Sequence, residues 1–460
     1  MIASLFSDLI SKYFSAVVGK VTEKYNGENT EPTMLHKSML TEEYSADLTW
    51  GSTDFNNTIV AADVVALESS IPLKKRDVIT TAIGQIPKLG LKYERGEKFL
   101  TDINVMRAKG VNEAQVAAKV LDDVAKCVKG MDVRKEIMFE QALSSGVTLI
   151  KDGTMFAGND GTGIRVDFGF PAANASNAEV TWGADSYTPI SDIRNMIDAA
   201  EGKGVTIRHL WMNRAAFDDI RTSAEGKQLA AVFNGVNIAA GVTLPVPSRA
   251  ALNDALADEF NVTIHIINGS FREQLPNGNF NTVTPWENGI IVGTTDTNVG
   301  RLVYGTLAEE TNPVNQVTYE KSGSHVLISK FSDTDPLVEY TAAQALCLPV
   351  IDNVNSIYRL NSTQAITFGG TDINSSGVVA LPKTQVSSAK VVTTSYAGYG
   401  TLTASRPAAD SWCTVAVSGS NINITATANS AQNAPKRSTT VTVTDGVVTK
   451  TFTVEQAANS

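Results

Sequence analysis

The chain has 460 residues, a net charge of −10, 43% hydrophobic residues and 19% charged residues, which is typical of folded proteins and excludes disorder as its main state. This length allows two or three domains with cores of their own. The charge is uneven, because residues 361–460 carry six Lys or Arg against four Asp or Glu and leave about −12 on residues 1–360. An acidic body argues against an overall nucleic-acid-binding surface, since phosphate contacts need clustered Lys and Arg.

The amino-terminal residues predict an amphipathic helix. Its apolar residues recur at helical spacing and are Ile2, Phe6, Leu9, Tyr13 and Val17. A signal peptide is not indicated, because there is no basic segment at the start and Asp8 and Lys12 interrupt the apolar run. Such a helix docks on protein or on lipid, and we expect protein. No later apolar stretch is long enough to span a bilayer, so no membrane partner is expected. Residues 22–58 are polar and predict an extended arm.

Residues 73–109 predict a long loop. Two short extended runs, 77–83 and 88–93, are separated by Gly and Pro and predict a hairpin. The bland interpretation is a solvated loop. However, almost forty residues without an evident core favour packing on a neighbouring subunit, with charges that pair across the interface. The cationic residues expected at this interface are Lys74, Lys75, Arg76 and Arg95.

A long or once-broken helix is predicted over residues 112–145. Asn112 is a suitable N-cap, an apolar stripe follows at 3.6-residue spacing, and Gly146 is a suitable residue to end the helix. Gly130 and Asp132 are the expected positions of a kink or restart. A strand is expected directly afterwards, from Val147.

Residues 148–360 mix helices and strands without a regular period, which predicts an α+β body rather than a doubly wound sheet or a solenoid. The expected helices are 190–201, 213–222 and 248–259. The expected strands are 163–168, 207–211, 262–267, 289–293, 299–304 and 325–331, with a last strand over 335–350. Residues 351–360 are expected to lead out of this body.

No catalytic or metal-binding pattern stands out in the sequence. The four histidines are His36, His209, His265 and His325. His209 and His265 lie in apolar runs and are expected to be structural, whereas His36 lies in the polar arm. The Gly-rich run 158–163 lacks the Gly-Lys-Ser/Thr ending of a phosphate loop. The widely spaced cysteines form no metal motif, and burial of reduced thiols is expected for Cys127, Cys347 and Cys413. We therefore expect no enzyme, no cofactor and no metal.

Residues 361–460 differ sharply from the rest of the chain. About a third of them are Ser or Thr, and short runs alternate apolar with polar residues, which predicts a β-sandwich. The runs are 412–417, 421–429, 437–444 and 448–456. This pattern resembles the BACON family of immunoglobulin-like domains, and the resemblance implies a module that touches carbohydrate. Trp412 is expected in the core, while Tyr396 and Tyr399 are the candidate glycan contacts.

The order of elements before the sandwich, together with several motifs, carries a second resemblance. The motifs are Ile86-Pro-Lys-Leu-Gly-Leu91, Glu136-Ile-Met-Phe-Glu140 running on to Gly146, Trp182-Gly-Ala-Asp185, Pro285-Trp-Glu-Asn-Gly-Ile-Ile-Val-Gly293 and Gly305-Thr-Leu-Ala-Glu-Glu310. Over about residues 1–360 the chain resembles the major capsid proteins of tailed phages with the Hong Kong 97-type fold, in particular the lambda-like major capsid protein E family.

This resemblance implies an α+β Hong Kong 97-type fold with a long spine helix and an E-loop, followed by an all-β immunoglobulin-like sandwich. The implied parts are an N-terminal arm (1–68), an E-loop (69–111), a spine helix with the peripheral domain (112–186), an axial domain (187–300), a return to the peripheral domain (301–360) and the sandwich (361–460). The E-loop would lie over an adjacent subunit, and the arm would reach along a neighbour. Some relatives crosslink Lys to Asn, but no pair in this chain can be matched.

The implied function is a bacteriophage major capsid protein that self-assembles in the bacterial cytoplasm. Its hexamers and pentamers would form an icosahedral shell around packaged DNA, and the virion would be its location. Implied partners are copies of itself, the portal and decoration proteins, and host or mucosal glycans. The alternative is a cell-surface carbohydrate-binding protein whose sandwich is the working part, against which the missing signal peptide argues. A third alternative, an enzyme with a binding module, requires a site that the sequence does not contain.

Overall fold

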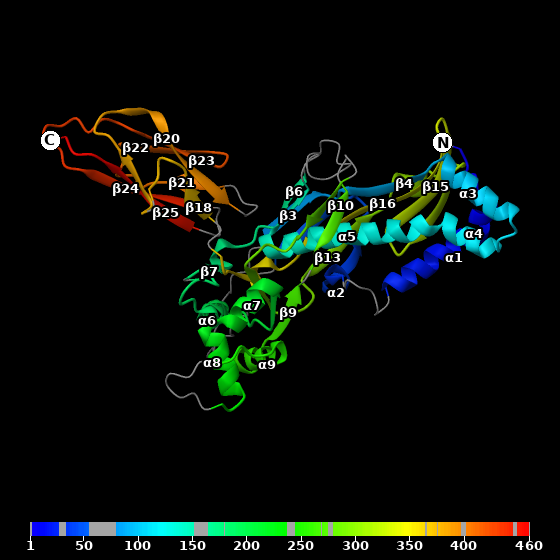
Figure 1. Ribbon diagram of the computed structural model, residues 1–460, viewed down its shortest axis with the longest axis horizontal. Coiled ribbons are helices and arrows are strands. Elements are labelled where there is room, and N and C mark those ends of the chain that lie inside the picture. The colour runs from blue at the N-terminus through cyan, green and yellow to red at the C-terminus, as the bar shows by residue number, and fades with distance from the viewer. Residues whose placement is uncertain are drawn as a thin grey trace, which may run out of the picture. The chain divides into compact units, whose positions relative to one another are not determined.

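The structure is a computed structural model that describes residues 2–26, 34–54, 80–150, 164–178, 180–236, 244–267, 269–274, 279–363, 366–374, 376–396, 402–444 and 449–459. The chain divides into two compact units (Figure 1). The first contains Met1–Gly169, Gly269–Trp286 and Asp296–Asn355. The second contains Phe170–Asn268, Glu287–Thr295 and Ser356–Ser460.

The first unit is built on a sheet that has six strands within the described ranges. The strands lie in the order β1 (Leu40–Tyr44), β13 (Gly300–Gly305), β16 (Leu337–Ile351), β15 (Val326–Thr334) and β14 (Thr318–Ser322), and β4 (Lys88–Arg95) also pairs with β16. The fifteen residues of β16 pair with β15 on one edge and with both β4 and β13 on the other. The predicted last strand over 335–350 is therefore confirmed, and it is the centre of the sheet.

The long helix is confirmed and is broken once, between α4 (Glu113–Val120) and α5 (Asp122–Ser145). The Asn112 side chain accepts a hydrogen bond from the backbone N–H of Ala114, and Gly146 ends the helix at a φ of 81°. The break was expected at the wrong place, since it lies at Leu121 and α5 runs through Gly130. At Gly130 a Cβ atom would meet the Leu91 side chain at 2.5 Å, so this glycine permits the close approach of β4 instead.

The N-terminal helix α1 (Ser7–Asn26) packs on protein, as expected, and it does so on α4, α5 and β14 of its own chain. Its buried residues are Leu9, Ile10, Phe14 and Val18, and Phe6, directly before the helix, is buried as well. The predicted stripe was partly wrong, because Tyr13 and Val17 are only half-buried and Ile2 is 37% exposed. The described part of the following segment is not an extended arm. It forms α2 (Leu35–Met39), β1, which pairs in parallel with β13, and β2 (Thr49–Asp54).

The hairpin predicted from residues 77–83 and 88–93 is wrong. Strand β3 (Thr80–Gln85) pairs with β2, whereas β4 pairs with β16. A helix, α3 (Glu97–Ala108), replaces the loop expected after β4, and it buries Leu100 and Ile103. This helix was not predicted, because its short apolar stripe lies among charged residues in the sequence. Residues 88–108 therefore have packing partners within their own chain, and deleting 73–109 would remove a strand of the central sheet.

The first unit also contains smaller elements. These are the antiparallel pairs β5 (Val147–Ile150) with β6 (Ile164–Asp167) and β10 (Phe271–Gln274) with β11 (Phe280–Val283), and the short helix α10 (Ala308–Thr311). Strand β5 confirms the strand expected after Gly146, and β6 the strand over 163–168. The Gly-rich run 158–163 lies outside the described residues.

The second unit contains a sheet with five strands in its described part, and four helices pack on one face of it through a shared apolar cluster. The strands lie in the order β7 (Ala175–Asn177), β17 (Tyr358–Asn361), β12 (Ile290–Thr294), β8 (His209–Asn213) and β9 (Thr263–Ile267). The helices are α6 (Pro189–Glu201), α7 (Arg214–Thr222), α8 (Ala224–Phe233) and α9 (Arg249–Phe260). Three of these helices match the predictions. Helix α8 was missed because it buries only Gly226 and Ala230 and so shows no apolar stripe.

The C-terminal residues form two facing sheets, each with four strands among the described residues. One has the order β18 (Ile366–Gly369), β20 (Val386–Tyr396), β23 (Asn421–Ala426) and β22 (Cys413–Ser418), and the other β19 (Val378–Leu381), β25 (Thr449–Gln456), β24 (Arg437–Thr444) and β21 (Thr403–Ser405). Alternating residues of both sheets meet in one apolar core. The predicted sandwich and the four strands proposed for it are confirmed.

Candidate functional site: charged networks beneath the long helix

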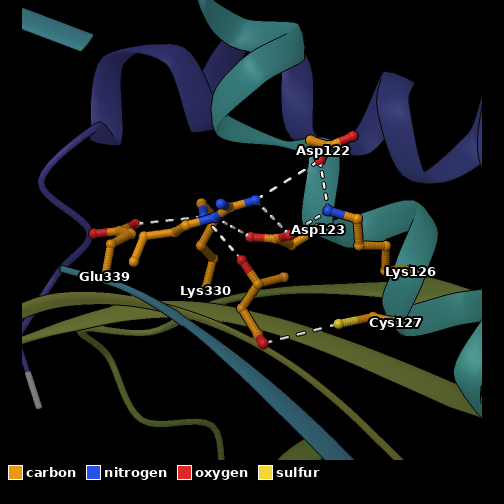
Figure 2. A network of polar contacts seen from close by, with 8 residues as sticks. Asp122, Asp123, Lys126, Cys127, Lys330 and Glu339 are labelled. Atoms are coloured by element: carbon orange, nitrogen blue, oxygen red, sulfur yellow. Dashed lines mark hydrogen bonds and ion pairs between the residues drawn. The ribbon is translucent and has the colours of Figure 1, made fainter. Parts of the chain in front are cut away.

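An ionic network joins the start of α5 to the end of β4 (Figure 2). The Arg95 guanidinium binds the Asp123 carboxylate through two hydrogen bonds, from Nε at 2.6 Å and from Nη2 at 2.7 Å. Lys126 Nζ lies 2.7 Å from Asp122 Oδ2 and 3.1 Å from Asp123 Oδ1. A two-point contact of this kind fixes direction as well as distance, so it holds the first turn of α5 on the edge of the sheet.

Asp123 is the central group of this network and is only 4% exposed. Burial alone would raise the pKa of its carboxyl group, but hydrogen bonds from Arg95 and Lys126 outweigh burial and leave the pKa below its ordinary value. Asp123 therefore stays ionised at neutral pH. The stability that it contributes is present above its unfolded pKa and is lost as the pH falls through the lower folded value.

A buried ion pair lies deeper, on the sheet itself. Lys330 of β15 and Glu339 of β16 are each 1% exposed, and Lys330 Nζ lies 3.7 Å from Glu339 Oε1 (Figure 2). Lys330 Nζ also donates to Thr341 Oγ1 at 3.0 Å. Burial lowers the pKa of Lys330, and the charge of Glu339 opposes that shift. Both charges are thus removed from water and depend on each other.

The N-terminal segment completes this pair. The Ser4 hydroxyl donates to Glu339 Oε1, and the backbone N–H of Leu5 donates to Glu339 Oε2 at 3.1 Å. Ile2 and Ser332 exchange two backbone hydrogen bonds, of 2.9 and 3.1 Å. Glu339 consequently ties the first residues of the chain to its central strand.

Cys127 closes the same network, with its Sγ donating to the backbone oxygen of Thr341 at 3.8 Å (Figure 2). Burial raises the pKa of its thiol to about 12, so it is not a nucleophile at neutral pH. The expected burial is confirmed for Cys127, Cys347 and Cys413.

A second network holds α2 against the middle of α5. The Glu136 carboxylate accepts the backbone N–H groups of Leu35 at 2.7 Å and His36 at 3.0 Å, and it lies 2.6 Å from His36 Nδ1. The prediction that placed His36 in a polar arm was wrong, since this side chain is 2% exposed. Burial lowers its pKa although Glu136 opposes the shift, so the imidazole is neutral at neutral pH.

Asp132 lies one turn earlier on α5 and binds two lysines. Its carboxylate lies 2.7 Å from both Lys37 Nζ and Lys135 Nζ, and Lys135 Nζ lies 3.1 Å from His325 Nε2. Burial, with help from Lys135, lowers the pKa of His325 to about 3. Lys37, Asp132 and Lys135 border a cavity of about 250 Å³. Among the described residues, no group of three or more His, Cys, Asp or Glu side chains could hold a metal ion.

The residues predicted for contacts with other molecules are placed as follows. Arg95 forms an ion pair within its own chain, with Asp123. Lys74, Lys75, Arg76 and Tyr399 lie outside the described residues, and Tyr396 is the last residue of β20. Lys330 and Glu339 were not predicted, although a lysine inside an apolar strand run was a usable signal for a buried pair.

The two strand histidines have the structural role that was expected. His209 Nδ1 lies 3.1 Å from His265 Nε2, and the His265 ring stacks on Trp211 with 3.9 Å between centroids. Trp412 is half-buried beside the sandwich core, and the Arg437 guanidinium lies 4.6 Å from the centre of its ring. The role expected for Trp412 is thus confirmed in part, and one face of the indole is occupied by Arg437.

Comparison with known proteins decides what this body is. The family model described as phage major capsid protein E matches residues 18–362, three quarters of the chain. The chain belongs to the phage major capsid protein E family. The BACON model, which is described as a binding domain, matches residues 401–457. Both resemblances proposed from the sequence are therefore confirmed, and with them the α+β Hong Kong 97-type fold class carrying an all-β module.

Solved structures of low similarity were also found. A protein described as a prophage capsid protein of Escherichia coli CFT073 is 12% identical with a TM-score of 0.46, and the match covers 75% of this chain and 98% of that one. The capsid asymmetric unit of cyanophage A-1(L) is 11% identical with a TM-score of 0.40, covering 73% and 94%. A Bacteroides thetaiotaomicron protein is 15% identical with a TM-score of 0.15, covering 20% and 86%. These scores carry no argument, and the assignment rests on the family match. No curated protein matches the chain.

Family membership settles the class of function. The protein is a structural, non-enzymatic capsid component of the phage virion. The alternatives of a cell-surface carbohydrate-binding protein and of an enzyme with a binding module are set aside, because the family covers the whole body that they left unexplained. In the part of the chain that the structure describes, no helix has the length and apolarity needed to cross a bilayer.

Proposed function

We propose that this capsid protein forms the hexamers and pentamers of an icosahedral shell around the phage DNA, and that its C-terminal sandwich is displayed outside. The observation that carries the proposal is the family match over residues 18–362, which stops where the sandwich begins. The networks beneath α5 support it, because they make a rigid body from segments more than 300 residues apart, such as Ser4 and Glu339. A rigid subunit fits repeated use in a closed shell.

The division into peripheral and axial domains belongs to the same proposal. The first unit, with α5 and the six-stranded sheet, would serve as the peripheral domain, and the α/β part of the second unit as the axial domain. Portal and decoration proteins would be further partners. The acidic body, at about −12, suits a wall around an anionic genome without specific contacts to it.

Negative-stain electron microscopy of the purified chain tests the shell directly. Uniform icosahedral particles or hexamers are expected, and a stable monomer at high concentration contradicts the proposal. Reversing the charges of Lys74, Lys75 and Arg76 to Glu tests the intersubunit loop, with assembly expected to fail while the monomer stays folded. Lys119→Glu, at an exposed position of α4, is a control. Normal particles from the triple variant would show that these three residues are not needed at a subunit interface.

We further propose that the sandwich binds glycans weakly, through Tyr396 or Tyr399, and gains strength from many copies on one particle. The BACON match supports this proposal, as does the position of Tyr396 at the end of β20. To test this, the chain should be truncated after Thr363 rather than after Leu360. Asn361 is paired within β17, and the backbone of Ser362 forms hydrogen bonds with the backbones of Gly289 and Trp182. Truncated particles should assemble and lose adhesion to a mucin-coated surface. The Y396A/Y399A double variant should assemble normally but lose adhesion. Unchanged adhesion would show that these tyrosines do not bind the glycan.

A further inference from the structure

Glu140 of α5 contacts both points at which the chain passes between its two units. The chain enters the first unit at Gly269 and leaves it after Trp286. A Cβ atom on Gly269 would lie 2.6 Å from Glu140 Oε1 and 3.1 Å from Oε2, so the backbone there lies directly against the carboxyl group. The backbone N–H of Trp286 donates a hydrogen bond to the same carboxyl group.

The segment 269–274 also follows α5 over two further turns. Phe271 packs with Ile137, and Arg134 Nη1 lies 2.7 Å from Glu273 Oε1. Gly269, Phe271 and Glu273 therefore meet α5 in the reverse order of the helix sequence, at Glu140, Ile137 and Arg134. Alternate residues of a strand share one face, and residues three apart share one side of a helix, so this contact is continuous. Glu140 lies at its end, where the chain crosses.

The carboxyl group of Glu140 is poorly satisfied. It is 2% exposed, and its Oε2 has no hydrogen-bond partner among the described residues. Burial and the nearby charge of Glu136 raise its pKa to about 8, although the Trp286 N–H opposes the shift. Glu136 itself is engaged by α2 through His36. On β10 the facing charged group is Glu273, whose pKa burial raises although Arg134 opposes the shift.

We propose that the carboxyl group of Glu140 is a protonation-controlled lock on residues 269–274 and 279–286, the described parts of the segment between the two crossings. In its neutral form it packs against Gly269 and meets Trp286. Loss of the proton places a second negative charge beside Glu136, and within the described ranges no cation forms an ion pair with Glu140, so the segment loosens. The start of α5 stays fixed on the sheet meanwhile, because Arg95 and Asp123 remain paired under the same conditions. The lock does not depend on the proposed shell.

Hydrogen exchange of the full chain between pH 6.5 and 9.5 tests the lock, with protection factors followed for peptides 269–274 and 279–286. In the unmodified protein, protection should fall by up to about tenfold per pH unit as the pH rises towards about 8, and it should level off above about 8, where Glu140 is ionised in the closed segment as well. Glu140→Gln keeps the shape without the charge and should remove that fall. Glu94→Gln, exposed on β4, is the control and should behave as the unmodified protein does. A fall that persists in Glu140→Gln, or its absence from the unmodified protein, overturns the proposal.

Glu136→Gln provides a second readout that does not require the Glu140 variant to fold. Removing the charge of Glu136 takes away one cause of the raised pKa of Glu140. The pH at which protection levels off should therefore move to a lower value. Levelling off at the same or a higher pH contradicts the electrostatic coupling on which the lock depends.

Discussion

The buried pair of Lys330 and Glu339 yields a quantitative prediction. Each side chain is 1% exposed, and the two charges are compensated by each other and by a few neutral groups. Replacing Lys330 with Met leaves the Glu339 carboxylate, among the described residues, with the Ser4 hydroxyl and the Leu5 N–H as partners. Breaking a fully buried pair in this way costs about 3 to 5 kcal/mol of unfolding free energy. Glu339→Gln should cost a similar amount, because Lys330 then retains only Thr341.

The double variant K330M/E339Q should differ from these two. It removes both charges and keeps similar volumes, and such replacements are close to neutral, within about 1 kcal/mol. The coupling between the two sites should therefore be several kcal/mol, far from additive. Lys88→Met is a matched control that breaks an exposed pair with Glu309, and it should cost no more than about 1 kcal/mol.

Urea unfolding of the unassembled chain measures these differences. Trp50 and Trp286 are buried in the first unit, and their fluorescence reports on its transition. If the effects of the two single variants simply add in the double variant, Lys330 and Glu339 do not stabilise each other, and the reasoning is refuted. A small effect of Lys330→Met would show that the N-terminal segment alone satisfies Glu339.

Three further predictions follow from other sites. The folded pKa of Glu140 is about 8 and its ordinary value is 4.5, so stability should be full below about pH 4.5 and should decline up to about pH 8. The loss at pH 7 should be on the order of 3 kcal/mol. Glu140→Gln should flatten this decline in urea midpoints measured at pH 5, 7 and 8.5, and equal slopes in the two proteins would contradict the prediction. Cys127 should resist iodoacetamide at pH 8.5 until the chain is unfolded, since its pKa is about 12, and rapid labelling of the native chain would show that the site opens. Asn112→Ala should cost about 1 kcal/mol through loss of the cap on α4, whereas Asn112→Asp should retain most of it.

Much of the local structure was predictable from the sequence. The cap at Asn112 and the helix end at Gly146 depend on side chains and backbone freedom at those positions alone. The alternation of residues 437–444 likewise predicted a strand whose apolar side faces a core. The motif around Glu136 and Glu140 carried the family resemblance, although it did not reveal that Glu140 is buried.

Strand pairing was predicted less well. Residues 80–85 and 88–95 are neighbours in the sequence and read as a hairpin, but they pair with β2 and with β16. Local periodicity indicates which face of a strand is apolar. It does not indicate which other strand will form hydrogen bonds with its backbone groups. The helix α8 was missed for a related reason, since its few buried residues leave no stripe to detect.

The sequence by itself thus determined most of the element types, the division between an α+β body and a β-sandwich, and the family. Tertiary structure alone decided that Lys330 and Glu339 meet under the N-terminal segment, and that Glu140 lies where the chain crosses between its units. The physical reason is that propensity, capping and periodicity act over a few residues. Burial of a charge depends on partners that are hundreds of residues away in the sequence. The free-energy cost of that burial depends on the opposite charges and hydrogen-bonding groups that those partners supply.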